Sequence, residues 1–152
     1  MIQRIQSLYL LAVAVLMGVL CFVPFVSFLH GTEIFRQTVW GISGTGEAAA
    51  VVVRTIPMGV LAVLSALLPL VTIFLYKNRE LQMRLCIVEA VLLLGVAVYM
   101  AMYLFRSGSD ISDKMALSVT DLFPLLGIVL VFMAFKRIMK DLLLVRSLDR
   151  IR

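Results

Sequence analysis

The stretch KNRELQMR, residues 77–84, decides the fold of this chain because it joins two long apolar runs, residues 56–76 and 85–105. A helix of about 20 apolar residues is long enough to cross the roughly 30 Å hydrocarbon core of a bilayer. So short a connection can only join two antiparallel helices on one side of the membrane. The stretch therefore predicts a helical hairpin and sets the topology of the rest of the chain.

The composition supports a membrane protein over a soluble one. Of the 152 residues, 62% are hydrophobic, well above the roughly 45 to 50% of soluble domains. Four apolar runs account for the excess, at about residues 8–29, 56–76, 85–105 and 116–135. We therefore expect an all-α membrane protein, a four-helix transmembrane up-down bundle that forms a single domain over residues 1–152.

The first and second runs are separated by the longest polar segment. Residues 8–29 are too long for the apolar region of a secretory signal peptide, so we expect them to remain as a membrane helix. Within the segment that follows, the glycine-rich residues 41–46 are typical of a turn and residues 48–53 are small and β-branched. Residues 33–55 thus predict a small periplasmic loop or hairpin with Trp40 as an interfacial anchor, unless residues 48–53 begin the next helix.

The fourth helix must begin before its most apolar part. Residues 122–135 would give only about 21 Å of helix, so we expect the helix to begin near Ala116. Asp121 then falls about 7 to 9 Å inside the apolar slab. A carboxylate at that depth needs a partner, such as Arg54 or Arg106, or water between helices.

A capping role is the simpler interpretation of Asp121. Ser118 and Asp121 have the spacing of a capping box, and Asp121 could also be the N-cap of a helix that starts at Leu122. The arrangement that the sequence excludes is an ionised Asp121 that faces lipid. Its desolvation would cost on the order of 2.5 to 3.5 kcal/mol.

Glu89 is the other acidic residue inside an apolar run. Counted from residue 85, it lies about 6 Å along the third helix, shallow enough to reach water or Lys77, Arg79 or Arg84. A structural ion pair is the simpler interpretation. The functional one is a small dimeric transporter or ion pathway that uses Glu89 and Asp121.

The basic residues indicate the orientation. The N-terminus, residues 77–84 and the tail, residues 136–152, hold ten of the fourteen lysines and arginines, so both termini are expected in the cytoplasm. The tail is amphipathic, with six basic and two acidic residues. Three interpretations of the tail stay open: it continues the fourth helix into the cytosol, lies on anionic headgroups, or docks on a partner.

No motif for catalysis or cofactor binding stands out. Cys21 and Cys86 are predicted near opposite faces of the bilayer, too far apart for a disulfide, and the lone His30 excludes a haem held by two histidines. Residues 41–46 lack the lysine of a phosphate-binding loop. We therefore predict no enzyme activity, no metal and no cofactor, and the excess of basic residues reports topology rather than nucleic-acid binding.

Three cytoplasmic pieces carry a family resemblance: MIQRIQ with LYL at residues 1–10, KNR with Gln82 and RL at residues 77–85, and LVRS with DRIR at residues 144–152. With four apolar runs, they resemble a Bacteroidetes family of small inner-membrane proteins known only as domain of unknown function number four-two-nine-three. A typical member has an acidic residue where Leu142 or Leu143 stands and a small one at Leu148. The resemblance implies bacterial inner-membrane residence and four helices, and it implies no activity.

The leading functional hypothesis is a non-enzymatic scaffold or accessory subunit whose basic cytoplasmic face binds a partner or anionic lipid. The expected partners are membrane lipid, a protein at the cytoplasmic face and, for the transport alternative, a second copy of the chain. The candidate functional residues are Glu89, Asp121, Lys77, Arg79, Arg84, Arg146, Asp149 and Arg150.

Overall fold

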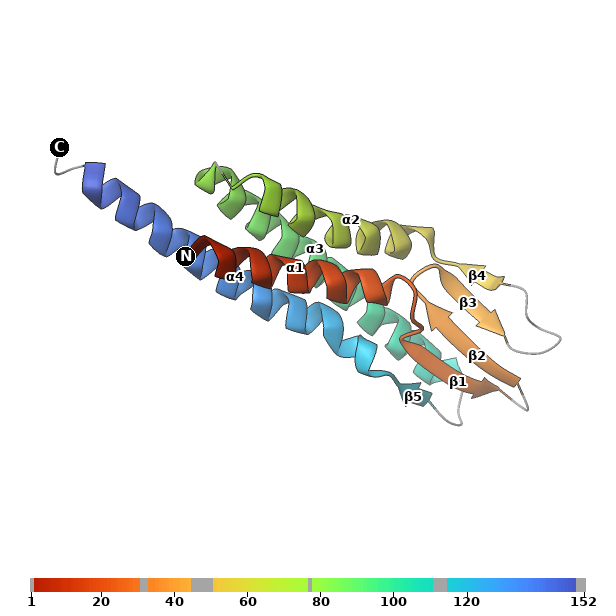
Figure 1. Cartoon of the computed structure of the whole chain (residues 1–152). Helices are drawn as coiled ribbons and strands as arrows, with labels where there is room; N and C mark the ends of the chain where they lie inside the picture. Colours follow the sequence, from red (N-terminus) through yellow and green to blue (C-terminus); the bar gives the residue numbers. More distant parts are fainter. Residues whose placement is uncertain (1, 31–32, 45–50, 77, 111–114, 150–152) are drawn as a thin grey trace.

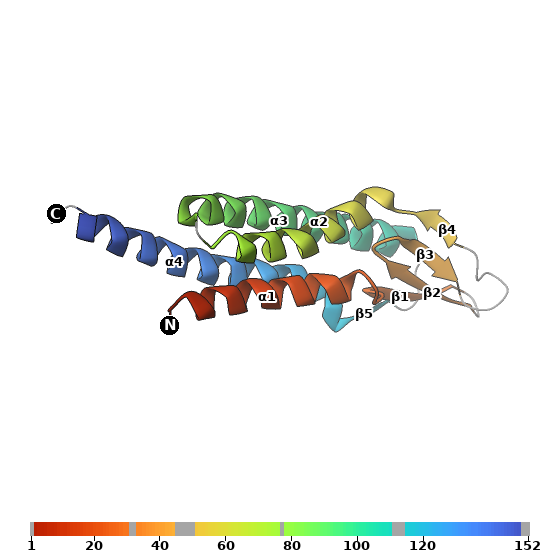
Figure 2. The ribbon, with the colours of Figure 1, turned by 45° about the horizontal axis from the view of Figure 1, so that its top comes forward.

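A computed structural model describes residues 2–30, 33–44, 51–76, 78–110 and 115–149. The described residues form four long helices: α1 (Ile2–Leu20), α2 (Ile56–Phe74), α3 (Arg79–Asp110) and α4 (Phe123–Asp149). They make an up-down bundle in which α1 and α3 each pack against both α2 and α4 (Figures 1 and 2). The predicted four-helix plan is thus confirmed, and both termini lie at one end, called here the terminal end.

The outward faces of the helices are largely apolar. Three helices are long and apolar enough to cross a membrane, over Ile56–Phe74, Arg79–Phe105 and Val119–Leu144. The apolar part of α1 is shorter and covers Ile5–Leu20. Large apolar side chains are exposed on every helix, for example Val15, Leu67, Val91 and Val129. A helix that is apolar all round is typical of a membrane span.

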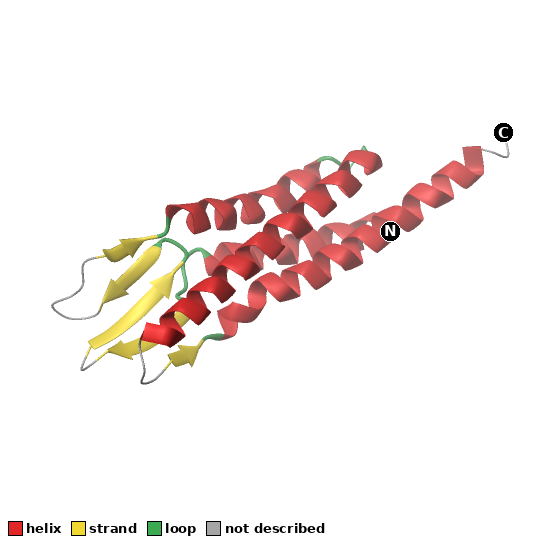
Figure 3. Cartoon of the chain, turned by 180° about the vertical axis from the view of Figure 1, so that it is seen from behind, coloured by secondary structure: helices red, strands yellow, loops and turns green. Residues whose placement is uncertain are grey.

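A five-stranded sheet covers the opposite end of the bundle, called here the sheet end (Figure 3). Its strands are β1 (Val26–His30), β2 (Glu33–Thr38), β3 (Gly41–Gly44), β4 (Val51–Arg54) and β5 (Met115–Leu117). Every neighbouring pair is antiparallel, in the order β4-β3-β2-β1-β5. The expectation of an all-α fold with at most a hairpin was therefore incomplete.

The first apolar run is not one helix. Helix α1 ends at Leu20, and the residues expected to complete it become β1. Pro24 lies between them and has no N–H to continue a helix ladder. The next residue, Phe25, instead donates its backbone N–H to the carbonyl of Gln37, 3.0 Å away, which starts the sheet.

The turn predicted at residues 41–46 was wrong for residues 41–44, and residues 45 and 46 lie outside the described part of the chain. Gly41–Gly44 is strand β3, and the turn before it consists of Val39 and Trp40. The Trp40 indole N–H donates to the carbonyl of Cys21 at 2.8 Å, and its ring packs so closely on Gly59 of α2 that an added Cβ there would lie 2.6 Å from it. These contacts between segments far apart in the chain outweigh the local preference of glycine for turns.

The alternative that residues 48–53 begin the second helix was also wrong where the structure describes them. Val51–Arg54 is strand β4, and α2 begins at Ile56 after Thr55. The backbone N–H of Thr55 donates to the carbonyl of Trp40, and its hydroxyl donates to that of Val39. The start of α2 is thereby fixed to the turn of the sheet.

Helix α3 is longer than the predicted span at residues 85–105, since it runs from Arg79 to Asp110. The fourth helix does not begin near Ala116, which lies in β5. A short 3-10 helix, η2 (Val119–Leu122), leads into α4 at Phe123. Helix α4 then continues without a break to Asp149, so the tail extends the fourth helix, as one of the three interpretations predicted.

Candidate functional site

The buried positions of each helix form a line with spacings that alternate between three and four residues, here called the inward seam. That spacing is the coiled-coil pattern expected of a bundle with small crossing angles. Most seam residues are apolar or small, and the polar ones are Gln6 on α1, Ser65 and Thr72 on α2, Gln82 and Glu89 on α3, and Asp141 on α4.

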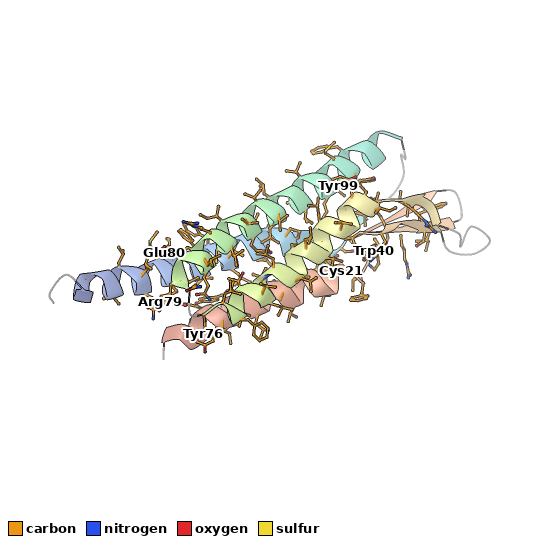
Figure 4. The ribbon with its side chains drawn as sticks, turned by 90° about the horizontal axis from the view of Figure 1, so that it is seen from above. Cys21, Trp40, Tyr76, Arg79, Glu80 and Tyr99 are labelled. Atoms are coloured by element: carbon orange, nitrogen blue, oxygen red, sulfur yellow. The ribbon has the colours of Figure 1, made fainter. Side chains whose placement is uncertain are left out.

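Four of these polar seam residues and the nearby Arg79 form an end cluster, which connects the four helices at the terminal end. The four seam residues are Gln6, Thr72, Gln82 and Asp141. The amide of Gln6 donates to a carboxylate oxygen of Asp141 at 3.0 Å, and both side chains are buried. Arg79 donates to the backbone carbonyl of Asp141 at 3.1 Å, and the amide of Gln82 donates to that of Thr72 at 2.9 Å. Figure 4 shows Arg79 at the start of α3 beside α4.

Glu89 lies further inside the bundle than the sequence predicted. Helix α3 begins at Arg79, so Glu89 is ten residues, about 15 Å, along it. Its side chain is 1% exposed, and neither carboxylate oxygen has a hydrogen-bond partner in the part of the chain that the structure describes. The predicted pairing with Arg79 is wrong, because that guanidinium bonds to Asp141 instead.

The register of α2 and α3 places Glu89 level with Ser65. Gln82 reaches Thr72, and the two helices run in opposite directions, so two turns onward from Gln82 correspond to two turns back from Thr72. Ser65 is the middle residue of α2, about 14 Å from either end of that helix. The carboxyl group of Glu89 therefore lies near mid-depth of the bundle rather than near its end.

Asp121 caps its own helix, as one of the sequence interpretations predicted. Its carboxylate accepts a hydrogen bond from the backbone N–H of Ser118 at 3.1 Å, as in a capping box at the start of η2. The other carboxylate oxygen is buried without a hydrogen-bond partner among the described residues, so no hydrogen bond joins it to Arg54 there. The idea that Asp121 is the N-cap of a helix starting at Leu122 was wrong, since Ser118 is the N-cap.

The structure separates Glu89 and Asp121. Asp121 lies at the sheet end, beside Thr120, whose hydroxyl donates to the carbonyl of Pro24 in the chain leading to β1. Glu89 lies level with the middle of α2, as derived above. The two acids therefore do not share one site.

The predicted basic face is only partly described. Arg84 is exposed, whereas Arg79 is half-buried in the end cluster. Lys77 and Arg150 lie outside the described residues. Arg146 and Asp149 belong to α4, but the placement of their side chains lies outside the description as well.

An apolar groove of about 550 Å³ lies on the outer side between α3 and α4. Cys86 and Ala90, which flank Glu89 along α3, line one wall, and Val131 and Phe132 line the other. The groove therefore lies beside the position of Glu89 on α3. Both cysteines, Cys21 and Cys86, are free and buried, as expected.

Sequence reasoning missed Gln6, Thr72, Gln82 and Asp141 as a group. The signal was the three-four spacing, which puts Gln6 one turn before Leu10 and Asp141 one turn after Ile138 on the inward seams. Among the described residues, no group of three or more His, Cys, Asp or Glu side chains is placed to hold a metal ion.

Comparison with known proteins places the chain in a family but assigns it no activity. The model of a family described as a domain of unknown function, DUF4293, matches residues 2–151. No curated protein matches the chain.

Proposed function

The chain belongs to the DUF4293 family, and on that basis we propose that it is a multi-pass protein of the bacterial inner membrane that acts as a non-enzymatic accessory subunit. It docks an acidic, amphipathic helix of a partner protein on the terminal end of α4. The observation that carries the proposal is the length of α4, which continues beyond the other three helices (Figure 1).

The projecting part begins where the end cluster stops. Asp141 is level with Gln6 and Arg79, near the first residues of α1 and α3, and α4 runs on to Asp149. Those eight further residues extend the helix by about 12 Å. An isolated pair of helical turns gains little stability by itself, which favours a partner that packs against it.

The chemistry of this end suits an acidic, partly apolar helix. Leu143 and Leu144 are 57% and 58% exposed, and the basic Arg137 and Lys140 are exposed beside them. The opposite face is already used, because Ile138 and Asp141 are buried against the bundle. The two leucines would form the buried apolar contact with the partner helix. Arg137 and Lys140 would attract its acidic side chains.

The orientation in the membrane is supported by charge and by the helix surfaces. The apolar outward faces fit lipid, and the lysines and arginines concentrate at the terminal end, which the positive-inside rule places in the cytoplasm. The partner would therefore meet α4 at the cytoplasmic surface.

The test is co-purification from native membranes in mild detergent, with the associated proteins quantified. Removal of residues 143–152 leaves the Gln6–Asp141 bond intact and should release the partner. Leu143→Gln with Leu144→Gln should lower its yield at least about tenfold, which corresponds to about 1.4 kcal/mol of binding free energy.

Leu81→Gln is the matched control, since Leu81 is an exposed leucine of α3 near the same end. It should leave the yield unchanged. Equal co-purification by wild type and the truncated chain would contradict the proposal. Retention on anionic lipid vesicles with no protein partner would show that the end binds headgroups instead.

A second candidate function is transport, favoured by the buried, unpartnered carboxyl group of Glu89. Because Asp121 lies apart as a cap, the pathway would use Glu89 alone. Proton-coupled flux in proteoliposomes should then vanish in Glu89→Gln and persist in Asp121→Asn. Flux that survives Glu89→Gln would rule the pathway out.

A further inference from the structure

Glu89 differs from every other residue in the apolar core of the helices. It is the one Asp, Glu, Lys, Arg or His in residues 5–20, 56–74, 85–105 and 123–135 taken together. An unpaired, ionised carboxylate at mid-membrane is costly even on the lenient insertion scale. A buried carboxyl group avoids this desolvation cost if it is protonated or binds a ligand.

We propose that Glu89 is a proton-binding site that exchanges its proton with solvent at the terminal end of the bundle only. The inference concerns the site itself and rests on neither function proposed above. Its basis is the polarity of the core on the two sides of Glu89.

On the terminal side, polar groups interrupt a core that also contains Leu10 and Ile138. Gln82 lies two seam positions before Glu89 on α3, with the thiol of Cys86 between them, and Gln82 donates to the backbone carbonyl of Thr72 on α2. The Gln6–Asp141 pair lies one further layer out. Buried polar groups of this kind can hold the water needed for proton exchange.

On the sheet side, the same seam is apolar. Leu93, Val96 and Met100 are 0 to 3% exposed, and the Leu93 side chain packs on Gly127 of α4. These three described seam residues offer a water chain no polar side chain. The sheet side therefore closes the site.

A proton fits the surroundings better than a metal cation does. A hard cation needs several oxygen ligands. At the level of Glu89, α2 offers the hydroxyl of Ser65, which donates to the carbonyl of Ala62 at 2.9 Å and can still accept a bond from a protonated carboxyl group.

The other charged or titratable groups lie one or more turns away. Helix α2 has no charged residue, α1 has none from residue 5 onward, and the inward acid of α4 is Asp141 in the end cluster. On α3 itself, Cys86 is one turn away and Arg79 bonds to Asp141. The proton occupancy of Glu89 is thus set chiefly by its own burial.

The test is labelling with dicyclohexylcarbodiimide in detergent micelles. A protonated carboxyl group adds across one C=N bond of the reagent and rearranges to an N-acylurea, so the protein gains one whole reagent molecule and loses no group. We expect one adduct per chain, located by peptide sequencing at Glu89. At high pH its rate of formation should fall about tenfold for each pH unit.

The controls separate the site from general reactivity. Glu89→Gln should abolish the adduct, and Asp121→Asn should label like wild type. Replacing choline chloride by sodium chloride at constant pH should leave the rate unchanged. An adduct elsewhere, a rate independent of pH, or protection by sodium would each overturn the proposal, and peptide sequencing decides the point on wild type even if Glu89→Gln does not fold.

Infrared spectroscopy tests the side of access. The carboxyl C=O band of Glu89, identified by its loss in Glu89→Gln, should shift on transfer to D₂O. Gln82→Met should slow that shift at least about tenfold, equivalent to about 1.4 kcal/mol in barrier, and Met100→Leu should not change it. Slowing by Met100→Leu alone would place the access at the sheet end and contradict the proposal.

Discussion

The two halves of the bundle core are built from different chemistry, although the same helices run through both. Toward the sheet end, the seam of α3 carries Leu93, Val96 and Met100, all buried. Toward the terminal end, it carries Gln82, Cys86 and Glu89. The apolar half therefore depends on close packing, whereas the polar half depends on a few specific hydrogen bonds.

The cost of a substitution in either half depends on the lipid that surrounds the helices. In lipid, apolar side chains gain little by leaving their environment, so helix association relies on shape and on bonds between polar groups. A cavity in the apolar half and a lost bond in the polar half should therefore have unequal costs.

Leu93→Ala should have the largest effect. Leu93 is fully buried against Gly127, and its truncation leaves a cavity worth about 2 to 3 kcal/mol of unfolding free energy. Unfolding in mixed micelles, followed by circular dichroism, measures the loss. The adjacent Leu94 is 55% exposed, and Leu94→Ala should cost less than about 0.5 kcal/mol. Equal losses in both variants would mean that the apolar half is loosely packed.

Gly59→Ala should come second, through the contact between α2 and the sheet. The new Cβ would lie 2.6 Å from the Trp40 ring, so the ring must move, at a cost of about 1 to 3 kcal/mol. Gly18→Ala is the matched helical control, since nothing lies within 4 Å of its new Cβ, and it should be neutral or stabilising. Quenching of Trp40 fluorescence reports the displacement of the ring, and an unchanged spectrum in Gly59→Ala would contradict this packing.

The Gln6–Asp141 bond should contribute least. A double-mutant cycle with Gln6→Leu and Asp141→Leu isolates its coupling, expected at about 0.5 to 1.5 kcal/mol of unfolding free energy. The same micelle titration measures it. Additive effects of the two substitutions would show that the end cluster is held by its other bonds.

The sequence predicted those features that depend on local pattern. Apolar runs predicted the four antiparallel helices, and the spacing of Ser118 and Asp121 predicted the cap, because a capping box is completed within one turn. Glu89 was predicted correctly as an acid within the apolar part of α3. Its depth was wrong, because α3 begins at Arg79 rather than near residue 85.

The features that the sequence did not predict depend on distant partners. Arg79 bonds to Asp141, 62 positions away, and no local rule pairs those residues. The turn at Val39 and Trp40 is set by Cys21 and Gly59, whereas local propensity favoured the glycines that follow. The sheet required β1 and β5 to meet across most of the chain.

The connectivity of the sheet also sets an order of assembly during synthesis. Strands β1 to β4 all lie between α1 and α2, so they can pair as soon as the first helical hairpin has emerged. Strand β5 follows α3 and pairs with β1, matching Val26 with Leu117 and Phe28 with Met115. This last pairing closes a loop of nearly ninety residues, a slow step by its contact order. The β1–β5 pairing therefore joins the α3–α4 hairpin to the α1–α2 hairpin through the sheet, after both hairpins have formed.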